Sequence, residues 1–95
     1  MFHGSKDVAV AGTELALAAA RTCARLTIQA KPANTGFVYV GVGTVTSTDY
    51  GIRLSASQTF TLGMGQTNGN PIDLAIVVID VSVSGEGVTY IGEAI

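Results

Sequence analysis

Residues 22–31 read Thr-Cys-Ala-Arg-Leu-Thr-Ile-Gln-Ala-Lys, and this stretch decides the fold class. Apolar and polar side chains alternate along it, which is the pattern of a half-buried β-strand. The apolar face would carry Leu26, Ile28 and Ala30, and the polar face Arg25, Thr27, Gln29 and Lys31. Residues 58–62 alternate in the same way, with Phe60 and Leu62 expected inside.

The segments on either side of these two stretches continue the β pattern. Residues 32–36 form a turn cluster, and residues 37–42 are apolar on both faces, so we expect a central strand or one covered on its outer side. Further extended pieces are predicted at 52–54, 74–79 and 88–91, with a tight turn at 85–87. The Ser/Thr-rich residues 43–51 indicate a loop or an edge strand, and 63–71 a loop.

Seven or eight short strands result, with turn signals at roughly every ten residues. This spacing is typical of an all-β sandwich or barrel, and we expect a small antiparallel β-sandwich. Residues 1–12 have few strand signals beyond a short β-type run at 8–11, and are predicted to be an N-terminal arm, partly flexible or partner-bound. Residues 13–95 would form a single β-sandwich domain. Within it, Ala-rich residues 13–21 favour a strand followed by a turn, with a short helix as the alternative.

The composition favours association with other subunits. The chain has 95 residues, of which 47% are apolar and only 13% charged, with a net charge of −2. Much of the outer surface must therefore consist of Thr, Ser, Gly, Ala and aliphatic side chains. A surface with so few charges does little to prevent association with other protein chains. The five basic residues form no dense run, so neither nucleic acid nor an anionic membrane is an expected partner. No secretory signal or membrane-length apolar run appears, and we expect a soluble protein made in a reducing cytoplasm.

Residues capable of catalysis are scarce. His3 is the single histidine and lies in the expected arm, and Cys23 is the single cysteine, so neither a disulfide, a zinc site nor a catalytic triad is predicted. Arg21 and Arg25 would lower the pKa of Cys23 if they lay close to it, but a buried structural cysteine is the favoured interpretation. We predict no enzymatic activity, no catalytic or metal-binding residues and no cofactor.

The other candidates have structural explanations. Gly41 and Gly43 fail the dinucleotide fingerprint and indicate a bulge or a strand end. Tyr39, Tyr50 and Tyr90 would suit a stacking platform for sugars or bases, although core and interface roles also explain them. The acidic residues are predicted to be solvated in turns, with a calcium site at loop carbonyls left open; they are Asp7, Glu14, Asp49, Asp73, Asp80, Glu86 and Glu93.

An ordered series of motifs carries a family resemblance. It runs from Thr-Ile-Gln-Ala at 27–30 and Asn-Thr-Gly at 34–36 to Tyr-Val-Gly at 39–41. It continues through Gly-Ile-Arg-Leu at 51–54 and residues 58–62 to Gly-Glu-Gly-Val-Thr-Tyr at 85–90. Over residues 22–92 the chain resembles small virion proteins of tailed bacteriophages.

The resemblance implies a β-sandwich, often jelly-roll-like, that decorates or cements the capsid. Such proteins commonly form trimers that bind the major capsid protein on the assembled head. The expected location is then the capsid surface of the virion, after synthesis in the cytoplasm of the bacterial host. The alternative is a carbohydrate-binding or accessory β-sandwich module of a phage tail, neck or fibre.

Overall fold

The computed structural model describes residues 1–63 and 69–94, and this part of the chain is all β, with antiparallel sheets and no helix. The described residues form ten strands: β1 (Phe2–Asp7), β2 (Leu15–Ala16), β3 (Thr22–Cys23), β4 (Arg25–Ala30), β5 (Val38–Val42), β6 (Ile52–Leu54), β7 (Thr59–Gly63), β8 (Ile72–Asp73), β9 (Val77–Val81) and β10 (Gly87–Glu93). The sequence predicts seven or eight; β3 and β8 have only two residues each, which leaves little pattern to detect. No helix long and apolar enough to cross a bilayer occurs in the described residues.

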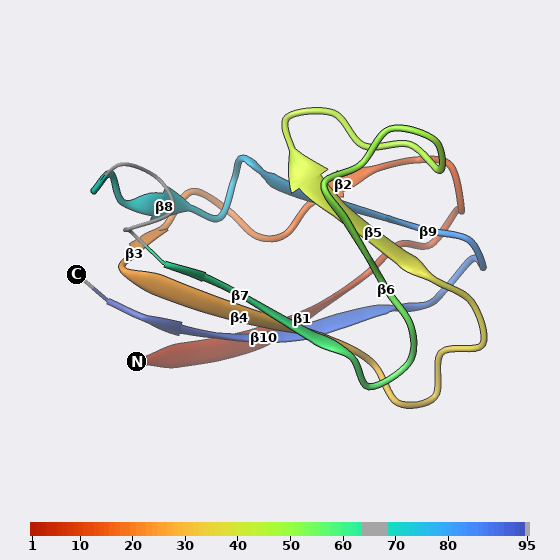
Figure 1. Cartoon of the computed structure of the whole chain (residues 1–95), viewed down its shortest axis with the longest axis horizontal. Coiled ribbons are helices and arrows are strands. Elements are labelled where there is room, and N and C mark those ends of the chain that lie inside the picture. The colour runs from red at the N-terminus through yellow and green to blue at the C-terminus, as the bar shows by residue number, and fades with distance from the viewer. Residues whose placement is uncertain (64–68, 95) are drawn as a thin grey trace.

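Two four-stranded sheets make up most of the structure (Figure 1). Sheet A has the strand order β1-β10-β4-β7, and sheet B the order β2-β9-β5-β6. The short strands β3 and β8 form a separate two-stranded sheet. All neighbouring strands are antiparallel.

The pairing is nested from the ends of the chain toward its middle. The first strand pairs with the last, β2 with β9, β3 with β8, β4 with β7, and β5 with β6. The described chain is thus one long folded hairpin, with the 43–51 loop at its tip. Two further pairs, β10 with β4 and β9 with β5, complete the two sheets.

One apolar core joins the two sheets. Leu26, Ile28 and Ala30 of β4 are at most 1% exposed, as their alternation predicts, and they share a cluster with Val40 and Ile79 of sheet B. Burying a side chain of the size of Leu or Ile stabilises the fold by about 1.5–3 kcal/mol. Strand β5 lies between β9 and β6, which confirms the central position expected for residues 37–42.

The N-terminal segment differs from its prediction as an arm. Phe2–Asp7 pairs along its whole length with β10 as an edge strand of sheet A. The polar composition of this segment gives no strand pattern in the sequence. An edge strand can form without one, because it is held by backbone hydrogen bonds and by a few contacts such as the Phe2 ring over Gly92. Residues 8–11, predicted as a β-type run, form bends and the start of a turn.

Two other segments test the sequence interpretation. The apolar run 74–79 is not one strand, because residues 74–76 form a turn between β8 and β9. Asp73 closes that turn: its Oδ1 accepts from Ala75 N–H at 3.0 Å, and its carbonyl accepts from Ile76 N–H at 3.1 Å. Residues 13–21 contain β2 followed by bends, as the favoured interpretation predicts, and no helix.

Candidate functional site

The outer surface of sheet A is hollowed, with a volume of about 620 Å³. We call this surface the hydroxyl face; its polar side chains come from four strands and are Ser5, Thr27, Gln29, Thr59 and Thr89. His3 and Ile91 border them, and Ile91 is 45% exposed. The face is broad, hydroxyl-rich and carries little charge.

Strand register builds the hydroxyl face in rows. Ser5 lies opposite Thr89, Thr89 opposite Gln29, and Gln29 opposite Thr59, so one row crosses all four strands. A second row carries His3, Ile91, Thr27 and Thr61. Rows two residues apart on one face are separated by about 7 Å.

Hydrogen bonds hold two of these side chains in place. The hydroxyl groups of Thr27 and Thr61 lie 3.0 Å apart, and Gln29 Nε2 donates to the carbonyl of Ser57 at 3.2 Å. The β-branched threonines are further restricted at χ1. A fixed, neutral array of this kind suits contact with another surface. His3 adds an imidazole, an acid–base group, to the border of the face.

A second hollow, the apolar cleft, opens between the two sheets. It has a volume of about 250 Å³ and lies where the edge strands β6 and β7 face each other. Its walls are almost entirely aliphatic and aromatic: Ile28, Val40, Val42, Ile52, Phe60, Leu62 and Val77, with Gly41 and Gly51. Val42 at this cleft is 67% exposed.

Cys23 is fully buried in the main core. Burial raises the pKa of its thiol, and the charge of Arg21 opposes this only in part. Arg21 also lies over the Phe2 ring, with its guanidinium carbon 3.7 Å from the ring centroid. A raised pKa keeps the sulfur protonated and unreactive, which agrees with the interpretation of Cys23 as structural.

The three tyrosines do not form one platform. Tyr39 and Tyr50 pack together on the outer side of sheet B with ring centroids 5.0 Å apart. Tyr39 is 8% exposed and Tyr50 39%. Tyr90 packs against the main core instead. Gly43, expected at a strand end, follows β5 with a φ of 82°.

Several of the acids make specific contacts and are not the freely solvated turn groups that the sequence suggests; Asp80 and Glu86 depart furthest from that prediction. Asp80 is 2% exposed, whereas Glu86 is only partly buried but accepts hydrogen bonds from Thr35 N–H, Thr35 Oγ1 and Gly36 N–H at 2.7–3.0 Å. The bonds from the backbone of Thr35 and Gly36 lower the pKa of Glu86. No group of three potential metal ligands occurs among the described residues.

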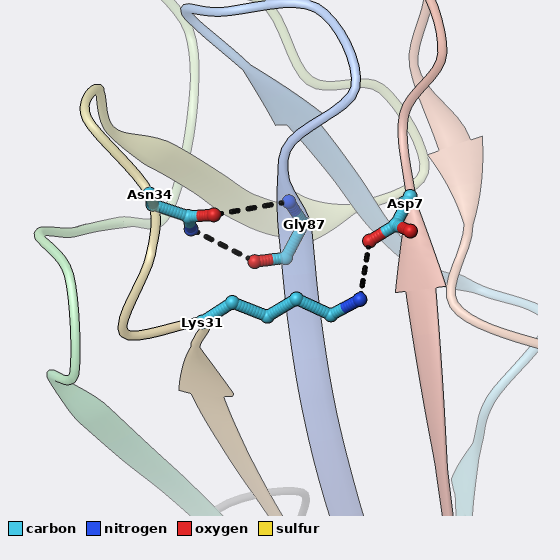
Figure 2. Close-up of polar contacts among 4 residues, drawn as sticks. All are labelled: Asp7, Lys31, Asn34 and Gly87. Carbon is cyan, nitrogen blue, oxygen red and sulfur yellow. Dashed lines mark hydrogen bonds and ion pairs between the residues drawn. The ribbon is translucent and has the colours of Figure 1, made fainter.

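Sequence reasoning missed the role of Asn34 in the same cluster (Figure 2). Its Nδ2 donates to the carbonyl of Gly87 at 2.9 Å, and its Oδ1 accepts from Gly87 N–H at 3.5 Å. Beside it, Lys31 pairs with Asp7 at 2.7 Å and ties β4 to the end of β1. An Asn in a turn signals the turn but not its distant partner.

Comparisons with family models, curated proteins and solved structures found no significant match for this chain.

Proposed function

We propose that this chain is a jelly-roll β-sandwich that binds assembled phage heads as a decoration or cement subunit. The observation that carries the proposal is the hydroxyl face, a broad and nearly uncharged surface on a chain that resembles virion proteins across residues 22–92. The expected partners are the major capsid protein and other copies of the chain, in a trimer.

The strand order supports the fold part of this proposal. With the two short strands β3 and β8 set aside, the remaining eight strands pair first with eighth, second with seventh, third with sixth and fourth with fifth. A long hairpin rolled into two facing sheets has this order, and it is the arrangement of eight-stranded jelly rolls. Capsid and lectin domains both use that architecture.

The surface supports the assembly part. Large apolar side chains are exposed at several places, and Ile91 lies within the hydroxyl face. A neutral face buried in an interface loses little hydration of charge, and interface cores are depleted of charged residues. Threonines fixed by packing also lose little side-chain entropy on contact.

The experiment is co-sedimentation with assembled heads, together with the oligomeric mass from sedimentation velocity. The wild-type chain should form a trimer and bind heads but not free capsid subunits. Thr89→Lys, in the middle of the face, should weaken head binding at least tenfold, whereas Thr48→Lys, an exposed threonine in the 43–51 loop, should bind normally. A monomer that ignores heads would refute the proposal.

Carbohydrate binding is a second candidate, favoured by the Tyr39–Tyr50 pair. Tyr50 presents an exposed ring that is supported from behind by Tyr39, and aromatic rings beside polar groups suit sugar binding. Tyr50→Ala should abolish retention on a glycan array, with Tyr90→Phe as the control. Absence of any retention by the wild type would remove this candidate.

A further inference from the structure

A third hollow, of about 350 Å³, lies at the surface beside sheet B. We call it the Asp80 hollow, because Asp80 of β9 lines it. The other groups that matter here are hydroxyl and backbone groups of Ala11, Gly12, Thr46, Ser47 and Ser82. The hydroxyl face and the apolar cleft share none of its lining residues.

The Asp80 carboxylate is buried, yet one of its oxygens accepts no hydrogen bond from the described residues. Both hydrogen bonds that it accepts end on Oδ1, from Gly12 N–H at 3.0 Å and from Val81 N–H at 2.8 Å. No donor among the described residues reaches Oδ2. Every side-chain oxygen that is fully buried in that part of the chain has a hydrogen-bond partner. Oδ2 has no such partner, so it is not fully buried and lies at the surface of the hollow.

The charge of Asp80 is not balanced by a cation of this chain within the described residues. The hollow has no Lys or Arg in its lining. Across sheet B, Tyr39 separates Asp80 from Arg53, and the Arg53 guanidinium lies 4.2 Å from the centroid of the Phe37 ring. A carboxylate removed from water is unfavourable unless hydrogen bonds and a cation compensate it.

A second acid, Glu14, joins the two loops that border the hollow. Glu14, two residues after Gly12, accepts a hydrogen bond from the backbone N–H of Val45, the residue before Thr46. Glu14 itself does not line the hollow. Calcium normally takes six to eight oxygen ligands, and the hollow offers a single carboxylate, so a nitrogen cation fits better than a metal ion.

We propose that the Asp80 hollow receives the ammonium or guanidinium group of a lysine or arginine from an adjoining protein chain. The assignment to an adjoining chain rests on the proposed function, whereas the cation site itself can be tested on the isolated protein. Guanidinium and ammonium groups form short, strong hydrogen bonds to carboxylates. The hollow has room for the end of such a side chain.

The test is an amide NMR titration with ethylguanidinium and n-butylammonium, with N-ethylurea and n-butanol as uncharged analogues. The amide signals of Gly12 and Val81 should shift with saturation for the cations only. Asp80→Asn, which keeps an oxygen for both amides, should weaken binding at least tenfold, and Asp49→Asn should not. Equal binding by Asp80→Asn, or by the uncharged analogues, would overturn the proposal.

A second variant covers the case in which Asp80→Asn does not fold. Ser47→Lys places an ammonium group of the chain itself beside the hollow, and it should block both probes while Asp80 remains. Continued probe binding by this variant would count against the site. Head binding is measured separately: probe binding without head binding refutes only the proposed function, and head binding without probe binding refutes only the cation site.

Discussion

Single residues tie the distant parts of this chain together at one end of the sheets. Asn34 bonds to Gly87 with both polar atoms of its amide, much as a strand residue bonds to its neighbour (Figure 2). Glu86 holds the backbone of Thr35 and Gly36 from the adjacent position. The 32–36 turn is therefore fixed to the start of β10 by side chains rather than by strand pairing.

The Asn34 contact predicts a measurable loss on truncation. Asn34→Ala removes two hydrogen bonds in a partly buried place, and we expect the free energy of unfolding to fall by about 1–2 kcal/mol. Urea denaturation measures this difference. Thr44→Ala, which removes an exposed hydroxyl in the 43–51 loop, should change stability by less than about 0.5 kcal/mol. Equal effects of the two variants would show that the Asn34 contact contributes nothing.

Glu86 predicts a pH dependence of stability. Its pKa is lower in the folded chain than the ordinary value of 4.5, because the backbone of Thr35 and Gly36 bonds to the charged form. The stabilisation is complete above the unfolded pKa and is lost as pH falls through the folded pKa. The Tm advantage of the wild type over Glu86→Gln should thus be constant from pH 6 to 8 and shrink below about pH 4.5.

The matched control for this experiment is Glu93→Gln, an exposed carboxyl at the far end of β10, the strand that begins just after Glu86. It changes the net charge equally, so a general charge effect would give it the same pH profile as Glu86→Gln. A wild-type advantage over Glu86→Gln that persists unchanged at pH 3 would contradict the assigned hydrogen bonds.

At the scale of the element, sequence alternation predicts strands where one face is buried and the other exposed. It succeeds for β4, whereas the central β5 is predicted by a run that is apolar on both faces. It fails for β1, whose residues are mostly polar, and for residues 74–76, where an apolar run conceals a turn. Propensity is local, whereas edge pairing and turn closure depend on partners that the local pattern does not contain.

Strand β9 offers a matched pair of isoleucines for testing the core. Ile79 is fully buried in the middle of sheet B, whereas Ile76, just before the strand, is 52% exposed. Ile79→Ala should lower the free energy of unfolding by about 2–5 kcal/mol through lost burial and the cavity left behind. Ile76→Ala should cost less than about 1 kcal/mol. Chemical denaturation of both variants measures the difference, and similar losses would contradict the core assignment.

At the scale of the whole molecule, the nested order means that most contacts join residues far apart in sequence. Strand β1 pairs with β10, so this pairing forms only when segments far apart in the sequence meet. We therefore expect folding in milliseconds to seconds rather than microseconds. The turn spacing in the sequence predicts the all-β class. The partner of each strand and the hollows between loops cannot be predicted in this way, because they arise only from long-range pairing. That is why Asp80, expected among solvated turn acids, is instead a buried group at the edge of a hollow.

The same topology predicts that the chain tolerates circular permutation. Phe2 lies opposite Gly92, so the start of β1 lies beside the end of β10 (Figure 1). A Gly/Ser linker of about six residues spans such a gap. New ends between Ser47 and Thr48 fall in an exposed loop, where cleavage costs only local hydrogen bonds around Thr46.

The permuted chain should keep the far-UV circular dichroism of the wild type and unfold cooperatively at a somewhat lower Tm. A chain opened within β4, between Thr27 and Ile28, should not fold, because it interrupts a buried strand that pairs on both sides. Folding of both permuted chains, or of neither, would contradict the nested pairing.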